Sequence, residues 1–258
     1  MNSFETSSCL VGYSGFVGGN LSVCRKFTER FRSSDIQNIE GKKYNLIICA
    51  GVPAMKYLAN RDPAGDMAGI KRLLSSLRKV ETDYFILIST IDVFPNPRGV
   101  NEETQPSYEN HPYGCHRLLV EEFVNHSFPN HLIVRLPGLF GPNLKKNVIF
   151  DLIHNNNLDK INPESCYQYY NVRRLAEEID RATVARLRLL HIATEPIRTK
   201  EIVSRFFPGK VVGVNAATSV FYDFQSRYAE IWGKDGPYLF EKKEVMADLA
   251  SYLQEEGI

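Results

Sequence analysis

Apolar residues along this chain fall into short unbroken runs, separated by longer stretches in which they recur every three or four residues. The runs predict buried strands at 8–11, 45–50, 84–90, 131–136 and 187–193. The stretches predict helices at 16–26, 66–80, 113–126 and from 241 toward the C-terminus. Strands that alternate with helices form a parallel sheet covered on both faces. The pattern therefore predicts an α/β fold, a doubly wound parallel sheet of the Rossmann type.

The pattern becomes less regular from about residue 143 onward. A length of 258 residues fits one large α/β domain. We therefore expect a single dinucleotide-binding domain over residues 1–258, to which segments at about 143–170 and 195–240 contribute a small C-terminal substrate-side cap.

Charge and hydropathy exclude two classes of partner. Lys and Arg total 31 against 30 Asp and Glu, interspersed along the chain, whereas a nucleic-acid-binding protein usually has a basic excess. No apolar run approaches 18 residues, and the first six residues carry no basic segment of a secretory leader. We expect a cytoplasmic protein with neither a nucleic acid nor a membrane as partner.

The five cysteines are widely spaced, with no Cys-x-x-Cys pair and no zinc-type cluster with histidine. Cys9 and Cys49 lie in apolar runs and are interpreted as small buried hydrophobes in a reducing compartment. No metal is expected.

Three glycines, Gly12, Gly15 and Gly18, follow the first predicted strand. The first permits a tight turn, the second lets backbone approach a pyrophosphate, and the third lets the next helix pack close to the sheet. The spacing differs from Gly-x-Gly-x-x-Gly, and a glycine-rich turn without ligand is the alternative. The order strand, loop, helix favours a dinucleotide. Its predicted contacts in the loop are Gly12, Ser14, Gly15, Phe16, Val17 and Gly18.

The chain near residue 32 bears on the choice of cofactor. Where an acidic residue usually binds the ribose 2′-hydroxyl of NAD, this chain has Arg32 and Ser33, whose charge and hydroxyl suit a 2′-phosphate. NADP is therefore favoured. A merely solvated Arg32 is the alternative, and Asp35 keeps NAD open.

Tyr113, Arg117 and Glu121 lie one turn apart on one predicted helix face. A cation four residues from a tyrosine favours the phenolate and so makes the phenol a usable general acid. On these residues alone, an Arg117–Glu121 helix pair beside a buried tyrosine is the better interpretation. His116 points to another face and is expected at the surface.

Several motifs in order resemble those of the extended short-chain dehydrogenase/reductase family, NAD(P)-dependent enzymes that include sugar-nucleotide epimerases, dehydratases and 4-keto reductases. Besides the glycine loop, the motifs are Ser89-Thr90-Ile91-Asp92-Val93-Phe94, Tyr113-Gly-x-x-Arg-Leu-x-x-Glu and Arg135-Leu-Pro-Gly-Leu-Phe-Gly-Pro. A weaker fifth motif spans 167–179. Together the motifs cover residues 8 to about 195.

The resemblance implies roles for individual residues. Tyr113 matches the family's acid/base tyrosine, and Thr90 matches the hydroxyl that hydrogen-bonds the reacting sugar oxygen. Arg117 stands where the family has a lysine that binds the nicotinamide ribose and lowers the tyrosine's pKa. Further cofactor contacts are implied for Ala50, Gly51, Val52, Tyr113, Arg117, Leu136 and Pro137. Substrate contacts are expected for Thr90, Asp92 and Asn147.

The resemblance implies an NADP-preferring reductase or epimerase that acts on a sugar nucleotide or related keto-sugar, with Tyr113 as acid/base. Ile91 replaces a second acidic residue of the dehydratases and argues against their chemistry. Since Arg117 cannot relay a proton, an NADP(H)-binding regulatory or scaffold protein with little catalytic activity is the alternative. A reductase of non-sugar carbonyls also stays open. The expected partner is a small-molecule substrate, and a homodimer, common in the family, stays open.

Overall fold

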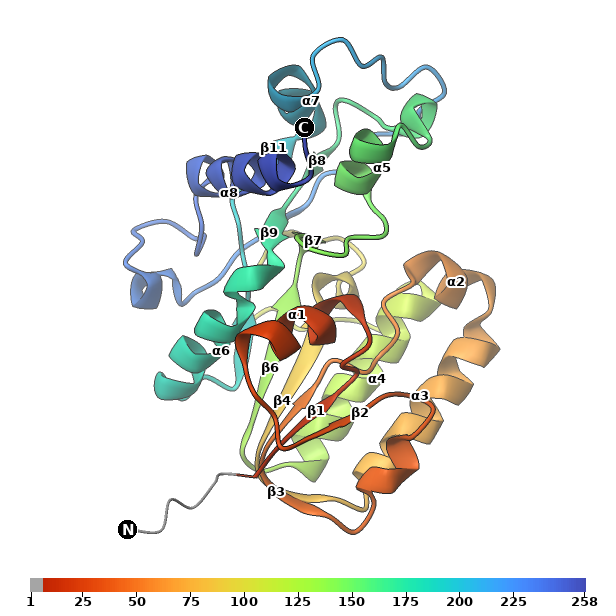
Figure 1. Cartoon of the computed structure of the whole chain (residues 1–258), viewed down its shortest axis with the longest axis vertical. Helices are drawn as coiled ribbons and strands as arrows, with labels where there is room; N and C mark the ends of the chain where they lie inside the picture. The colour runs from red at the N-terminus through yellow and green to blue at the C-terminus, as the bar shows by residue number, and fades with distance from the viewer. Residues whose placement is uncertain (1–6) are drawn as a thin grey trace. The chain divides into compact units, whose positions relative to one another are not determined.

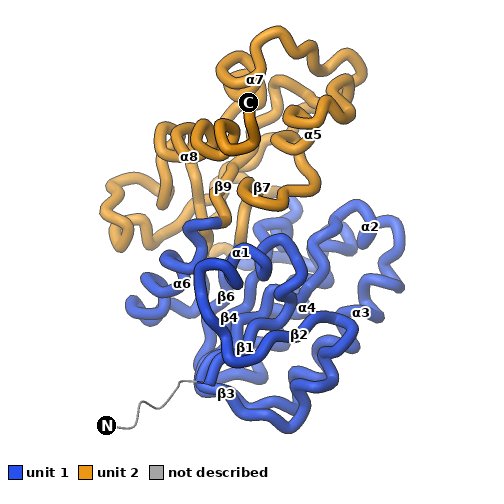
Figure 2. The backbone as a smooth tube through the Cα atoms, in the orientation of Figure 1, with its two compact units in different colours: residues 1–95, 105–135, 173–190 blue, residues 96–104, 136–172, 191–258 orange. Residues whose placement is uncertain are grey.

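The computed structural model describes residues 7–258 (Figure 1). The first six residues, to which the prediction of no secretory leader refers, lie outside this range. The chain folds as two compact units, drawn in different colours in Figure 2. The first unit comprises the residues up to 95, 105–135 and 173–190, and the second comprises 96–104, 136–172 and 191–258.

The first unit holds a six-stranded sheet and its helices. Its strands are β1 (Ser8–Val11), β2 (Glu29–Phe31), β3 (Lys43–Cys49), β4 (Glu81–Thr90), β6 (His131–Leu136) and β10 (Leu189–His191). Its helices are α1 (Phe16–Cys24), α2 (Lys56–Arg61), α3 (Pro63–Leu77), α4 (Pro112–Ser127) and α6 (Leu175–Val184). The last residue of β6 and of β10 belongs to the second unit.

The strands are arranged in the order β10-β6-β4-β3-β1-β2. β1 pairs in parallel with both β2 and β3, and β3 pairs in parallel with β4. The chain thus leaves β1 toward one edge and returns to its other side at β3. In doubly wound sheets this reversal of strand order is where ligands bind, beyond the carboxyl ends of the strands. The predicted fold class is confirmed, and it brings the loops after β1 and β3 together.

Helices cover both faces of this sheet. One face packs against α3 and α4 through apolar side chains at helical spacing, namely Ile70, Leu73, Leu74, Leu77, Val120, Phe123 and Val124. Cys9 and Cys49 lie in the same cluster and are fully buried, as predicted, so burial raises the pKa of their thiols to about 12 and about 11. Side chains of alternate strand residues, Leu10 and Ile48 among them, are buried as well. Burial on both sides explains the unbroken apolar runs.

The long helices of this unit begin at local signals. Asp62 accepts a hydrogen bond from the Gly65 N–H at 2.9 Å, and Pro63 follows it, so α3 begins three residues before the predicted start. His111 accepts from the Gly114 N–H at 2.9 Å in the same way, ahead of Pro112. α4 therefore spans the predicted helix with one further residue at each end. α1 ends two residues earlier than predicted, at Cys24.

The second unit is built from small sheets and three helices. Its strands are β5 (Arg98–Val100), β7 (Gly138–Phe140), β8 (Cys166–Tyr167), β9 (Tyr169–Asn171), β11 (Ile197–Arg198) and β12 (Asp223–Phe224). Its helices are α5 (Val148–His154), α7 (Thr199–Phe206) and α8 (Lys242–Glu255). β7 pairs with β9 and β5 with β12 in parallel, while β8 and β11 are antiparallel. Both segments expected to form the cap lie in this unit, and their role toward a substrate stays a prediction.

Within residues 7–258, no helix has the length and apolar character needed to cross a membrane.

Candidate active site

At two positions, the loop after β1 has a geometry that only glycine can adopt. Gly12 has φ +89°, and a Cβ atom there would lie 2.4 Å from the Ala50 carbonyl oxygen. A Cβ on Gly18 would lie 2.2 Å from the Gly12 carbonyl oxygen. At Gly15 the closest atom would be 3.3 Å away. Gly12 and Gly18 therefore hold loop, helix and neighbouring strand together, and Gly15 lies on the less crowded side.

The N-terminus of α1 meets this loop without a capping side chain. Gly15 is its N-cap residue, and its first turn has no acidic residue. Ser14 and Gly15 are exposed, and Phe16 and Val17 are half-buried. A helix N-terminus presents N–H groups and positive dipole to an anion. The narrow glycine cradle and this helix end fit the diphosphate of a dinucleotide.

The end of β2 lies against the same loop. The Gly12 N–H donates to the Phe31 carbonyl at 2.7 Å, which places Arg32 and Ser33 next to the glycine cradle. Asp35 accepts a hydrogen bond from the Arg32 N–H at 2.7 Å and lies 3.5 Å from its Nε. The Asp35 carboxylate is thus used in a local turn, while more than half of the Arg32 side chain is exposed.

The loop after β3 forms another wall of the cradle. The Ala50 N–H donates to the Val11 carbonyl at 2.9 Å. A Cβ on Gly51 would come 2.8 Å from Val11 Cγ1, so this segment lies tightly against the end of β1. Val52 packs against the core below. The predicted cofactor residues 50–52 are therefore brought to the glycine loop.

Thr90 and Tyr113 meet beyond the carboxyl end of β4. Thr90 ends β4, and its Oγ1 accepts from the Asp92 N–H at 3.2 Å at the start of the short helix η2 (Ile91–Val93). Tyr113 lies in the first turn of α4, which packs on η2, and is buried. Its N–H donates to Asn60 Oδ1 at 2.9 Å.

The environment of Tyr113 keeps its phenol protonated. Burial raises the pKa of Tyr113 above its usual value, and the charge of Asp92 adds to this. The Arg117 charge, a hydrogen bond with Thr90 and the Lys56 charge act in the opposite direction. The expected influence of Arg117 on the phenol is present, but burial outweighs it.

Arg117 is held by an acidic partner from α3. Its guanidinium forms two hydrogen bonds with Asp66, one of 2.9 Å from Nη2 to Oδ1, and Nη2 also donates to the Pro53 carbonyl. Only 4% of the Arg117 side chain and 7% of Asp66 are exposed, and the Arg117 Cζ lies 4.0 Å from the centre of the Tyr113 ring. Arg117 Nε is buried with no hydrogen-bond partner in the described chain. Removing one partner of such a buried pair costs about 3–5 kcal/mol.

The alternative of an Arg117–Glu121 helix pair is wrong. Glu121 pairs with Arg135 of β6 at 2.6 Å and accepts from Ser89 Oγ at 2.5 Å. Both partners come from sheet strands, so Glu121 stabilises α4 on the sheet while Arg117 stabilises it on α3.

The prediction of a surface position for His116 is also wrong. Its side chain is 13% exposed, and Nδ1 lies 2.7 Å from Asp66 Oδ2. α3 packs against α4 and covers this face as well. Burial acts to raise the pKa of Asp66, but hydrogen bonds from Arg117 and His116, together with their charges, hold it below the usual value.

Lys56 is another site residue, besides Asp66, that the sequence patterns did not single out. It is the first residue of α2, and its Nζ lies 2.8 Å from Asp92 Oδ1. The side chains are 38% and 19% exposed, so this pair is partly solvated. Exposed pairs of this kind contribute about 0–1 kcal/mol. No local signal marks Lys56, because it reaches the site only through the packing of α2 on α4.

Three predicted residues belong to the second unit. Leu136, at the end of β6, is buried, and Pro137 follows it. Asn147 is the N-cap residue of α5, where its Oδ1 accepts from the Phe150 N–H at 3.1 Å and its Nδ2 donates to the Leu139 carbonyl at 2.7 Å. Both ends of this side-chain amide thus stabilise the start of α5. Its contact with a substrate stays a prediction.

The comparison with family models decides the identity of the fold family. The model of the NAD dependent epimerase/dehydratase family matches residues 36–192, more than half of the chain. The chain belongs to this family. The match confirms the family resemblance and the expected class of enzyme, an NAD(P)-dependent oxidoreductase or epimerase of the short-chain dehydrogenase/reductase type. A sequence comparison with curated proteins finds no match.

Solved structures of family enzymes share the fold over nearly the whole chain. The dTDP-4-dehydrorhamnose reductase of Clostridium acetobutylicum has 15% identity and a TM-score of 0.73, covering 98% of this chain and 100% of its own. The Bacillus anthracis dTDP-4-dehydrorhamnose reductase, in complex with NADP, has 17% identity, a TM-score of 0.73 and coverages of 99% and 100%. The Thermotoga maritima UDP-glucose 4-epimerase with UDP-glucose has 13% identity, a TM-score of 0.69 and coverages of 98% and 100%. These likenesses extend over the glycine loop, which lies outside the family match.

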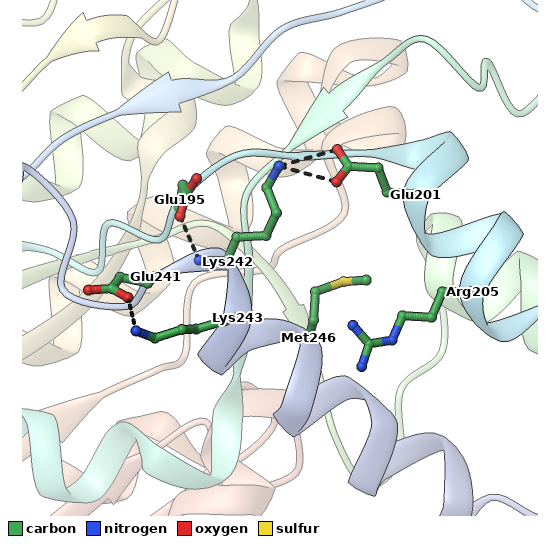
Figure 3. Close-up of a pocket in the computed structure, with 7 residues that line it drawn as sticks. All are labelled: Glu195, Glu201, Arg205, Glu241, Lys242, Lys243 and Met246. Carbon is green, nitrogen blue, oxygen red and sulfur yellow. Dashed lines mark hydrogen bonds and ion pairs between the residues drawn. The ribbon is translucent and has the colours of Figure 1, made fainter.

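The second unit also has a hollow on its surface that lies outside the family motifs (Figure 3). Its volume is about 400 Å³, and it is lined by Glu195, Glu201, Arg205, Glu241, Lys242, Lys243 and Met246. Lys242 pairs with Glu201 at 3.2 Å and Lys243 with Glu241 at 2.7 Å. No residue predicted for the family site lines it. We interpret it as a hollow bordered by surface ion pairs.

Proposed function

We propose that this chain is an NADP-preferring reductase of a sugar nucleotide or related keto-sugar, with Tyr113 as the acid/base residue. The observation that carries the proposal is that Thr90 and Tyr113 meet beyond β4, where the surroundings of Tyr113 keep its phenol protonated. Epimerisation of the same substrate class is the nearest variant. A cytoplasmic location and a homodimer stay predictions.

The cofactor assignment rests on the glycine cradle. Gly12, Gly15 and the N-terminus of α1 would bind the diphosphate, and Arg32 with Ser33 would bind a 2′-phosphate. One similar structure contains NADP and another, a protein called MoeE5, contains NAD. When bound, the nicotinamide supplies the hydride. Arg32 favours NADP here, because Asp35 is used in its own turn.

The substrate class is proposed from the enzymes whose solved structures are similar to this chain. The similar structures include reductases named for dTDP-4-dehydrorhamnose and an epimerase with UDP-glucose. Asp92, beside Thr90, and Asn147 remain the candidate contacts for the sugar. A protonated Tyr113 can donate its proton to the oxygen of a keto group at the reacting carbon.

The direction of proton transfer follows from the electrostatics of Tyr113. The phenol is protonated near pH 7, so it can donate a proton to a carbonyl oxygen that Thr90 also contacts. Burial raises its pKa and weakens it as an acid, and the charges of Arg117 and Lys56 offset part of this effect. The reverse task, removing a proton from an alcohol, needs the phenolate, which burial disfavours. An epimerase needs both directions, whereas a reductase needs only the first. The site therefore favours reduction.

The test is Tyr113→Phe, assayed by NADPH oxidation with a 4-keto nucleotide sugar. General acids contribute about 10²–10⁴-fold, so we expect kcat to fall within that range while NADPH affinity stays within about threefold. Tyr108→Phe is the matched control, because it removes a more exposed hydroxyl that donates to Glu122 at 2.6 Å. Unchanged turnover in Tyr113→Phe would refute the role of this residue.

One observation favours a second function, an NADP(H)-binding regulatory or scaffold protein. Arg117, at the position of the family's lysine, is engaged by Asp66 and the Pro53 carbonyl. This function predicts tight binding of NADPH without turnover on a panel of keto-sugars, sugar nucleotides and simple carbonyls. A single clear turnover on the panel would eliminate it.

A further inference from the structure

A second cation lies beside Tyr113 and comes from a part of the chain that the family motifs do not include. We propose that Lys56 supplies a positive charge that supports proton transfer from Tyr113, part of the task that the family resemblance gives to a lysine at position 117. Lys56 would thus be a positioning residue for the proton transfer. The inference rests on the proposed function of Tyr113.

The geometry of α2 places Lys56 at the site. Lys56 Nζ lies 2.8 Å from Asp92 Oδ1, and the Asp92 N–H donates to Thr90 Oγ1 at 3.2 Å. One turn further along α2, Asn60 Oδ1 accepts from the Tyr113 N–H at 2.9 Å. Residues four apart lie on the same helix face. One face of α2 therefore contacts both Asp92, which is hydrogen-bonded to Thr90, and the backbone of Tyr113.

The two cations near Tyr113 differ in their burial. Arg117 is buried, bound twice to Asp66 and once to the Pro53 carbonyl, and stacked on the Tyr113 ring. Lys56 is more than a third exposed, and its ammonium is a compact charge on a flexible stem with three donors. A buried pair resists separation far more than a solvated one. Lys56 is therefore the more exposed cation of the two, held by a partly solvated pair rather than a buried one.

The charges facing Tyr113 come from three elements. Asp92 of η2 raises the pKa of Tyr113, whereas Arg117 of α4 and Lys56 of α2 lower it, against the dominant effect of burial. Lys56 also offsets Asp92 by pairing with it. The pKa of His111, next to these groups, is held low by burial and by the Lys56 charge. Removing Lys56 therefore leaves Asp92 uncompensated and makes Tyr113 a weaker acid.

The experiment compares Lys56→Met, Lys56→Arg and the control Lys42→Met in NADPH oxidation with the 4-keto nucleotide sugar. Lys42 is also 38% exposed and pairs with Glu29 at 2.7 Å, before β3 rather than after it. We expect kcat to fall about tenfold or more in Lys56→Met with KM changed less than threefold. Lys56→Arg restores most of the rate because it restores the charge, and Lys42→Met resembles the wild type.

A second readout does not depend on turnover. The pKa of His111, followed by NMR, is expected to rise in Lys56→Met and to stay near the wild-type value in Lys56→Arg and Lys42→Met. A catalytically active Lys56→Met with an unchanged His111 pKa would overturn the role of Lys56 alone. A wild-type protein that turns over no substrate would instead overturn the proposed function, and this inference with it.

Discussion

The glycine loop and the start of α4 are both parts of the candidate site, but different forces hold them in place. In the loop, backbone meets backbone, and Gly12 and Gly18 leave no room for a Cβ atom. At the start of α4, the arrangement depends on buried charges, with Arg117 and His116 both bound to Asp66 of α3. The loop follows the family pattern, whereas the helix departs from it at Arg117.

The difference shows how the departure is accommodated. A lysine at position 117 has one compact charge that a cofactor can share, while the arginine here has a planar group that matches a carboxylate in two places. Asp66 takes up that match. The consequence is a helix that is more firmly held and a cation that is less available, which leaves Lys56 as the more exposed charge at the site.

The largest expected effect is that of Asp66→Asn, which disrupts the buried charges that hold the start of α4. It leaves the buried Arg117 without its charge partner, so the free energy of unfolding should fall by about 3–5 kcal/mol in urea titrations. The control is Asp180→Asn, whose pair with Arg25 is partly solvated and should contribute about 1 kcal/mol or less. Equal losses in the two variants would show that the Arg117–Asp66 pair does not hold α4.

A smaller effect is expected from Gly18→Ala, which disrupts the close packing of the glycine loop. The new Cβ would lie 2.2 Å from the Gly12 carbonyl oxygen, so the loop must shift, at a cost of about 1–3 kcal/mol. NADPH affinity should fall along with stability. Gly19→Ala is the matched control, since its Cβ would lie 3.6 Å from the nearest atom and alanine favours a helix. A Gly18→Ala protein that keeps full stability and affinity would contradict the account of the loop.

Arg32→Ala tests how the glycine loop and its neighbours choose between NADPH and NADH. We expect it to reduce the preference for NADPH over NADH by about tenfold, or ~1.4 kcal/mol, because the partner of the 2′-phosphate is lost. Titrations with both nucleotides measure this. NADH affinity should hardly change, and an unchanged ratio would mean that Arg32 is only a solvated side chain.

The most gradual effect is a dependence of stability on pH. The pKa of Asp66 is lowered in the folded protein, so its contribution is present above the unfolded-state pKa and is lost as pH falls through the folded-state value. Thermal unfolding followed from pH 7 down to about pH 2 should show a steeper acid loss in the wild type than in Asp66→Asn. Parallel curves would contradict the depressed pKa.

The parts that could be predicted from sequence are those set by local chemistry. β1, Gly12, Gly18 and the start of α1 are contiguous, and the strand and helix periods predicted the sheet that surrounds them. The partners of Arg117 and His116 could not be predicted this way, because Asp66 lies about fifty residues earlier and meets them only when α3 packs on α4. Lys56 was missed for the same reason. When helix packing brings charged partners together, their spacing in the sequence does not reveal the pair.

The most direct test of the account is calorimetric titration of NADPH and NADH into the wild-type protein. The glycine cradle, the N-terminus of α1 and Arg32 predict saturable binding of one dinucleotide per chain, tighter for NADPH than for NADH. Absence of binding by both nucleotides would contradict the central claim, because the loop would then be a structural turn, and neither Tyr113 nor Lys56 would have a hydride transfer to serve.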